Sequence, residues 1–230
     1  MNRVLSAKKI IEIKNLQSIN IFWGFFTFFL ILNFTLSTSF NYSTTTYMSS
    51  LAVYIFLFIS NHILIKNNFH YCIHFGVTRS EFIKASFVSS FQRTIVMVLI
   101  NLILLLAVNG FTTALNINYF SMFSWSDVFT SHSYIVSNIW IDLCIGIFVS
   151  SMAMLSGALH YKWGLFGPLS LAVILLITVT LPSIRSHLFE AGKDVFMHQS
   201  LGSFSWLLVA SVIVWGCIYL LLQKVDLIRR

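Results

Sequence analysis

The 230-residue sequence is poor in charge, proline and cysteine: 9% of its residues are charged, and it has two prolines and three cysteines. A soluble domain carries about 25% charged residues, so this chain lacks the polar coat that a globule needs in water. The scarcity of proline fits long helices better than a loop-rich fold. Cys72, Cys144 and Cys217 are too widely spaced for a disulfide framework or a CxxC metal pair, so we expect reduced packing residues.

The chain also lacks the motifs of several enzyme classes. It has no GxxxxGK[ST] phosphate loop, no HExxH zinc motif and no GxSxG nucleophile motif. We therefore expect no ATPase or hydrolase site in this chain, and we do not expect it to be an enzyme. Any driven work would take its energy from another polypeptide or from an ion gradient.

What the chain does have is six apolar runs, each near the ~20 residues that a helix needs to cross the hydrocarbon of a bilayer. Backbone polar groups in lipid must be satisfied within the segment, so these runs are predicted to be helices. The sequence thus predicts an all-α integral membrane protein with one six-span domain over residues 18–230. The expected spans are 19–36, 48–65, 94–115, 134–155, 165–181 and 204–222.

Residues 1–17 mix lysine and arginine with aliphatic residues. Such a stretch can lie on a membrane with its aliphatic side chains inward and its lysines at anionic headgroups. We therefore expect an amphipathic interfacial helix here, with a solvated tail as the alternative. A cleaved secretory signal is less favoured, because the following apolar run is longer than the ~7–15 residues of the apolar region within a signal peptide.

The basic residues predict the orientation of the chain. With six spans, both termini share one side with the loops between spans two and three and between spans four and five. Of the 14 lysines and arginines, all but Arg185 and Lys193 would lie on that side. This is the positive-inside pattern, so both termini and these loops are expected in the cytoplasm. Because the basic residues do not form one patch, the net charge of +7 does not indicate nucleic-acid binding.

The loop between the second and third expected spans carries a helix-start signature. Gly76 breaks the chain, and Thr78 is followed three residues later by Glu81. This is the capping box, in which the two side chains satisfy two free backbone N–H groups. We therefore expect a short helix at 76–84 within the loop.

That short helix would be basic through Arg79 and Lys84, and Phe82 and Ile83 would give it an apolar side. A membrane protein with such a feature on its cytoplasmic side is expected to present it to a partner.

Asp142 is the only carboxylate inside an expected span. An acid in lipid is costly and is by default a functional hypothesis. One interpretation gives it a direct substrate or proton role on a translocation path with Asn101 and Asn138. The alternative is a carboxyl group hydrogen-bonded to Asn101, Asn138 or another helix.

Four small residues follow on the same expected span at spacings of four, three and four. A strip of this kind lets helices approach closely in lipid. We expect a helix–helix contact, either between two subunits or within one chain. The residues are Gly146, Ser150, Ala153 and Gly157.

His70 and His74 have a spacing of four, which can hold zinc on a helix. No acidic residue or further paired ligand follows at a useful spacing, so we expect headgroup-level histidines beside Lys66 and no metal site. A membrane enzyme that uses Asp142 with histidines is the least favoured function, because no clustered acids support it.

Three stretches together resemble the small permease subunits of type 2 ABC exporters from Gram-positive bacteria. They are the basic N-terminal stretch, FGVTRSEFIKAS between spans two and three, and LHYKWGLFGP before span five. The second stretch is similar to the coupling helix that docks into the ATP-binding subunit in that family. Ser80 and Ala85 depart from the family pattern, where lysine and glycine are common. The implied coupling residues are Gly76, Val77, Thr78, Arg79, Ser80, Glu81, Phe82 and Lys84.

The resemblance implies a partner ATP-binding subunit that carries ATP and magnesium, a second permease subunit of the same or a paralogous chain, and no cofactor in this chain. It implies a bacterial cytoplasmic membrane, and re-entrant helices within 183–203. Arg79 would meet acidic residues of the ATPase, and Phe82 would occupy its groove.

Among the relatives, exporters of amphipathic peptide toxins and antimicrobial peptides are the most similar, including the phenol-soluble modulin exporter group. The alternative function is a membrane interaction protein without transport, such as a self-immunity factor against a peptide toxin. That protein would need no ATPase.

Overall fold

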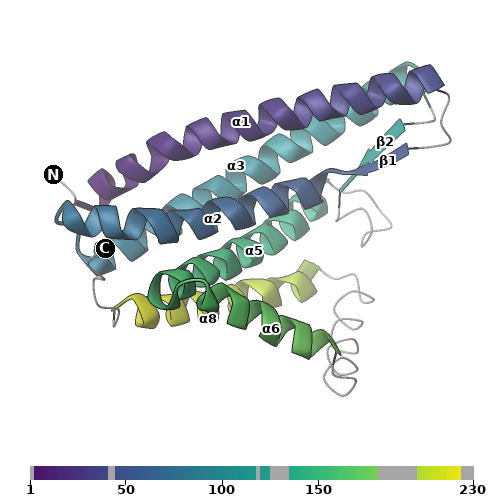
Figure 1. Cartoon of the computed structure of the whole chain (residues 1–230). Helices are drawn as coiled ribbons and strands as arrows, with labels where there is room; N and C mark the ends of the chain where they lie inside the picture. The colour runs from purple at the N-terminus through teal and green to yellow at the C-terminus, as the bar shows by residue number, and fades with distance from the viewer. Residues whose placement is uncertain (1–2, 41–44, 118–119, 125–134, 181–200, 224–230) are drawn as a thin grey trace.

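The computed structural model describes residues 3–40, 45–117, 120–124, 135–180 and 201–223 (Figure 1). These residues are almost entirely helical, and the loop predicted to hold re-entrant helices lies mostly outside them. The elements are α1 (Arg3–Phe40), β1 (Thr45–Met48), α2 (Ser49–His74), α3 (Arg79–Ala114), β2 (Phe120–Phe123), α5 (Ile135–Trp163), α6 (Phe166–Thr180) and α8 (Leu201–Gln223).

The helices form an elongated bundle (Figure 1). α1 packs on α3, α3 packs on α2, and α5 lies between α2 on one side and α6 and α8 on the other. The α2–α3 turn and the start of α1 lie at one end, which we call the turn end. β1 and β2 lie at the opposite end, which we call the strand end.

Five of the described helices are long and apolar enough to cross a membrane: α2, α3, α5, residues Gln17–Ser37 of α1 and Phe204–Gln223 of α8. This confirms the coarser prediction of a helical chain of the membrane-spanning type. α6 covers the fifth expected span but has 15 residues. That length is about 22 Å of helix against about 30 Å of hydrocarbon. The six-span count therefore stays a prediction.

The start of α1 differs from the expected arrangement. The sequence predicts an interfacial helix over 1–17 and a separate span from residue 19, whereas α1 runs from Arg3 to Phe40 without a break. Sharp kinks arise mainly at proline or at glycine and serine pairs, and no proline or glycine occurs between residues 3 and 23. Residues 3–17 are thus continuous with the first span, and their position relative to a membrane stays a prediction.

The sequence predicts neither strand. β1 and β2 pair in parallel, with Thr45 opposite Phe120 and Met48 opposite Phe123. Parallel strands need a long crossover connection, which the α2–α3 hairpin supplies. From the sequence, residues 40–47 are expected to form a short turn and residues 116–133 an interfacial aromatic stretch. The structure instead joins these two outer segments through β1 and β2.

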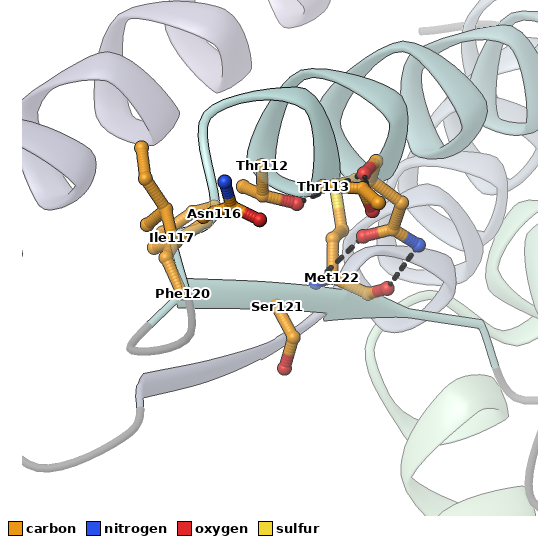
Figure 2. A pocket seen from close by; sticks show the side chains of 8 residues that line it. Thr112, Thr113, Asn116, Ile117, Phe120, Ser121 and Met122 are labelled. Atoms are coloured by element: carbon orange, nitrogen blue, oxygen red, sulfur yellow. Dashed lines mark hydrogen bonds between the residues drawn. The ribbon is translucent and has the colours of Figure 1, made fainter.

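Asn109 of α3 anchors β2, because its side-chain amide makes two hydrogen bonds to the Met122 backbone, as a neighbouring strand would (Figure 2). Its Nδ2 donates to the Met122 carbonyl at 2.9 Å, and its Oδ1 accepts from the Met122 N–H at 3.2 Å. A pocket of about 390 Å³ beside this contact is lined by residues of α3 and β2, including Thr112 and Phe120. Since a two-stranded unit is marginal alone, α3 supplies the support that these short strands need.

The strip of small residues on α5 faces α2 and α3 inside the chain, and we call this contact the α5 seam. A Cβ atom on Gly157 would lie 2.6 Å from the His62 backbone oxygen, and one on Gly146 would lie 2.8 Å from Thr94 Cγ2. Ala153 is fully buried. The strip is therefore occupied within one chain and is not available to a second subunit.

Gly157→Ala tests the α5 seam. The new methyl group meets a backbone carbonyl, which cannot rotate away, so α5 must shift from α2. We expect the free energy of unfolding to fall by about 1–3 kcal/mol, as over-packing of a tight core does. The measurement is thermal unfolding of the purified protein in detergent.

Gly216→Ala on α8 is the control, because nothing lies within 4 Å of its added Cβ atom. Alanine is a better helix former than glycine, so this variant should melt no lower than the parent. Equal melting of the two variants would contradict the close contact at Gly157.

Candidate functional site

The α2–α3 turn ends α2 with a Schellman motif. Gly76 has a φ of 77°, in the left-handed region that glycine adopts without strain. The Gly76 N–H donates to the Ile73 carbonyl at 3.0 Å, and the Val77 N–H donates to the Cys72 carbonyl at 3.1 Å. Val77 and Cys72 also pack in one buried cluster, which is the apolar contact that accompanies this motif. Gly76 therefore reverses the chain at a defined position.

α3 begins two residues later with the capping box that the sequence contains. Thr78 Oγ1 accepts from the Glu81 N–H at 3.3 Å, and the Glu81 carboxylate accepts from the Thr78 N–H at 2.8 Å. The helix then continues to Ala114. The expected short helix at 76–84 is thus not separate, because no proline or glycine interrupts the chain before Gly110. The segment after Thr78 forms the first turns of a long helix.

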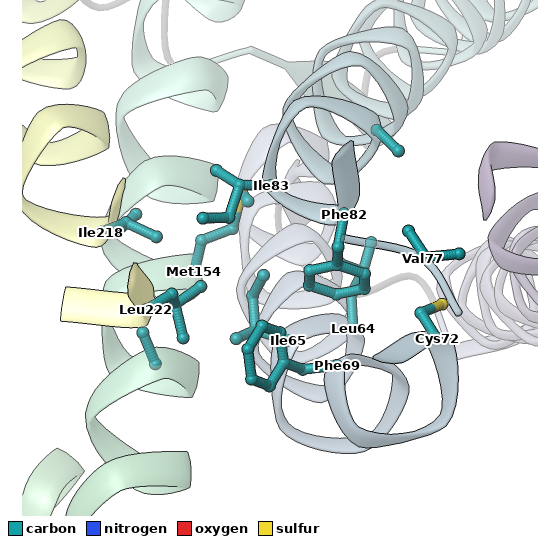
Figure 3. Packing of buried hydrophobic residues seen from close by; sticks show 12 residues of the cluster. Leu64, Ile65, Phe69, Cys72, Val77, Phe82, Ile83, Met154, Ile218 and Leu222 are labelled. Atoms are coloured by element: carbon teal, nitrogen blue, oxygen red, sulfur yellow. The ribbon is translucent and has the colours of Figure 1, made fainter. Parts of the chain in front are cut away.

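Aromatic packing fixes this turn to the rest of the bundle (Figure 3). Phe82 is 0% exposed, and its ring lies 5.2 Å from that of Phe69 in an edge-to-face contact. Phe69 makes a similar contact with Tyr161 of α5 at 4.9 Å. Ile218 and Leu222 of α8 belong to the same cluster. The expectation that Phe82 occupies a groove of an ATPase is therefore corrected, since its ring lies inside this chain's own core.

The remaining expected coupling residues divide by exposure. Val77 is buried, Gly76, Thr78 and Lys84 are exposed, and Arg79, Ser80 and Glu81 are half-buried. Arg79 Nη1 donates to the Gln223 carbonyl at the end of α8, at 2.6 Å. A cation is favourable at a helix C-terminus, so this bond ties α3 to α8.

The most exposed apolar residues of the turn precede Gly76. Phe75 is 74% exposed, and Tyr71 is also exposed. We call the exposed residues here the turn surface; they are Tyr71, His74, Phe75, Gly76, Thr78 and Lys84. The expected coupling residues start at Gly76, so they do not include these two aromatic residues, although the stretch FGVTRSEFIKAS begins at Phe75.

The histidines of the turn end pair with each other. His70 Nε2 and His74 Nε2 lie 2.9 Å apart, so one ring donates a hydrogen bond to the other. Within the described ranges, no group of three or more histidine, cysteine, aspartate or glutamate residues is arranged to hold a metal ion.

A buried polar cluster surrounds Asp142 toward the strand end. Tyr54 donates to Asp142 Oδ1 at 2.7 Å, and Ser124 donates to Oδ2 at 2.6 Å. Ser50 Oγ lies 2.6 Å from Ser124 Oγ, and Asn101 Nδ2 donates to Ser50 Oγ at 3.5 Å. These hydrogen bonds can therefore form a chain in which Asn101 donates to Ser50, Ser50 to Ser124, and Ser124 to the Asp142 carboxylate.

This Asp142 cluster joins α2, α3, α5 and the residue after β2. Asp142 is 6% exposed, and its partners on α2 and near β2 are hydroxyl groups. The structure thus has Asp142 hydrogen-bonded to another helix, which is one of the two expected alternatives. Asn101 reaches it through Ser50, and Asn138 is buried one turn earlier on α5. A role on a translocation path stays a prediction.

Sequence reasoning missed the partners of Asp142. Ser50 and Tyr54 stand four residues apart in an apolar run, and a polar pair on one helix face is a usable signal. Ser124 gives no such signal, because its place depends on the pairing of two distant strands. Arg93 is also missed as a buried residue: the sequence counts it among the inner-side charges, whereas the structure buries it between α2 and α3.

The fold and these two sites define a helical protein of the membrane-spanning type, with an anchored turn at one end and a buried carboxylate cluster toward the other. Comparison with protein-family models, curated proteins and solved structures finds no match to the chain. Its function is therefore proposed from its own residues and geometry and from the resemblance described above.

Tyr54→Phe tests the Asp142 cluster. It removes one donor to a buried carboxylate without changing the ring. We expect the free energy of unfolding to fall by about 1–2 kcal/mol, the range that model peptides give for interhelical hydrogen bonds in membranes. Thermal unfolding in detergent measures the change.

Tyr219→Phe is the matched control. The Tyr219 ring packs against the buried cluster that contains Phe69, and no hydrogen bond of its hydroxyl is seen in the described part of the chain.

A double variant tests whether Tyr54 and Asp142 are coupled. In the Asp142→Asn background, Tyr54→Phe should lower the free energy of unfolding less than it does in the parent, since the shared hydrogen bond is already altered. Additive losses would show that the two residues are not coupled.

Proposed function

We propose that this chain is the membrane-spanning subunit of an ATP-driven exporter, powered by a separate ATP-binding subunit that docks on the α2–α3 turn. Two such subunits would form the pathway, with one ATPase bound to each. The partner would bind ATP and magnesium. The proposed cargo is an amphipathic peptide, such as a toxin or antimicrobial peptide, which the family resemblance favours.

The anchoring of the turn is the observation that carries this proposal. A force on a turn moves membrane helices only if the turn is held rigidly against them. Here Phe82 and Phe69 pack with α5 and α8, and Arg79 binds the end of α8. A displacement of the turn would therefore be shared by α2, α3, α5 and α8.

α3 offers a direct path from one end of the bundle to the other. It spans 36 residues without a break, a length of about 54 Å. Its far end holds β2 through Asn109. Movement at the turn end would thus reach the strand end, and would bias the bundle between inward-closed and outward-open arrangements. Such a switch needs two states with different contacts, which ATP-driven closure of the partner would supply.

Docking would use the turn surface and not the buried ring of Phe82. Phe75 and Tyr71 offer apolar area, and Lys84 offers positive charge for an acidic region of the ATPase. Arg79 can still contribute, because a guanidinium has five N–H donors and Gln223 takes a bond from Nη1. Charge reversal at Arg79 would also break the bond to α8, so Phe75 gives the sharper test.

Phe75→Ser should abolish co-purification with the ATP-binding subunit of the proposed exporter, and should remove stimulated ATP hydrolysis. The melting temperature of the isolated chain should not change, since the Phe75 side chain is exposed and has little packing to lose. Phe166→Ser is the control: Phe166 is 81% exposed and begins α6, after the α5–α6 turn.

Normal complex formation and hydrolysis in the Phe75 variant would contradict docking on the turn surface. A chain that binds no ATP-binding subunit and still protects cells from a peptide toxin would instead be an immunity protein.

A further inference from the structure

Arg93 is a buried cation whose position suggests a ligand. It is 4% exposed and lies on α3, fourteen residues after Arg79. Its Nη1 donates to Asn61 Oδ1 of α2 at 3.3 Å, and Asn61 is held in turn by a bond from its Nδ2 to the Leu57 carbonyl at 2.9 Å. The guanidinium is therefore oriented by a fixed amide group.

The other donors of this guanidinium have no acceptor in the described part of the chain. Nε and Nη2 of Arg93 are both buried without a hydrogen-bond partner. In a guanidinium, the Nε–H and Nη2–H bonds point the same way and form a fork. This fork matches the two oxygens of a carboxylate or phosphate.

Neither of the two carboxylates whose side chains the structure describes, Glu81 and Asp142, pairs with Arg93. Glu81 belongs to the capping box at the turn, and the carboxylate of Asp142 accepts hydrogen bonds within the Asp142 cluster toward the strand end. A buried charge without a partner is costly, by several kcal/mol in general. The structure thus leaves a donor pair of Arg93 without an acceptor among the described side chains.

Two further buried polar atoms near Arg93 also lack partners in the described residues. Trp23 Nε1 is one, and the Trp23 ring packs with Leu57 and Met97. These two residues lie one helical turn from Asn61 and Arg93 respectively. Ser86 Oγ is the other, two turns before Arg93 on the same buried face of α3. Trp23 Nε1 is therefore a second unsatisfied donor where α1 packs on α2 and α3.

We propose that Arg93 binds an oxyanion, a carboxylate or phosphate group carried by an apolar molecule that enters between α1, α2 and α3. The apolar side chains of Leu57, Met97 and Trp23 select an amphiphile over a free inorganic anion. The carrier is either a peptide with its C-terminal carboxylate or a lipid with its phosphate. The peptide source rests on the proposed export function, whereas oxyanion binding itself does not.

The experiment measures thermal unfolding of the full chain in an uncharged detergent with decanoate, decyl phosphate or decyltrimethylammonium. We expect both anions to raise the melting temperature and the ammonium compound to leave it unchanged. Arg93→Met should lose this stabilisation. Arg93→Lys should bind at least about tenfold more weakly, because lysine keeps the charge but lacks the fork.

The variants also separate a ligand site from a structural role. Without probe, Arg93→Met should melt no lower than the parent, because it removes an unpaired buried charge. Arg79→Met is the control and should keep the response to the anions. A large loss of stability in Arg93→Met without probe, or equal responses to the anions and the ammonium compound, would overturn the proposal.

Two further comparisons identify the carrier, and neither uses an ATPase, so a failure to dock one leaves them intact. An amphipathic peptide with a free C-terminus should stabilise the parent more than its amidated form if cargo supplies the anion. Phosphatidylglycerol should co-purify with the parent but not with Arg93→Met if a lipid supplies it. If neither difference appears, the inference is wrong.

Discussion

The close approach of α5 to α2 at Gly157 is the contact on which the rest of the structure depends. Helices in lipid gain little from the hydrophobic effect between them, so their association relies on packing and interhelical hydrogen bonds. With no side chain at Gly157, α5 comes against the His62 carbonyl. This contact fixes α5 for both sites: Tyr161 meets Phe69 at the turn end, and Asp142 meets Tyr54 toward the strand end.

The two ends of the bundle are built from different chemistry, and α3 connects them. Apolar and aromatic packing holds the turn end, where the helices must move as a unit if a partner pushes on them. Directional hydrogen bonds hold the strand end, through Asp142 and Asn109. Arg93 lies between these regions on α3, with donors that the described residues leave unused. The proposed export cycle and the proposed oxyanion site therefore share one long helix.

The features that the sequence predicts correctly are those formed by residues close together in the chain. The capping box of Thr78 and Glu81 marks the start of α3, because both partners lie within one helical turn. The sequence predicts a shorter helix than α3, because the polar, basic stretch after Gly76 has the composition of a loop although no residue in it interrupts a helix. The sequence also does not predict the burial of Phe82, because its ring contacts Phe69 on α2, which in turn contacts Tyr161 on α5.

The sequence by itself determined a helical chain of the membrane-spanning type, since the length and hydropathy of each apolar run are local properties. It also determined the turn at Gly76, where a positive φ favours glycine. Only the tertiary structure decided the parallel pairing of β1 with β2, the partners of Asp142 and the burial of Arg93. These features join residues far apart in the chain, and no local pattern specifies which distant surfaces meet once the helices pack.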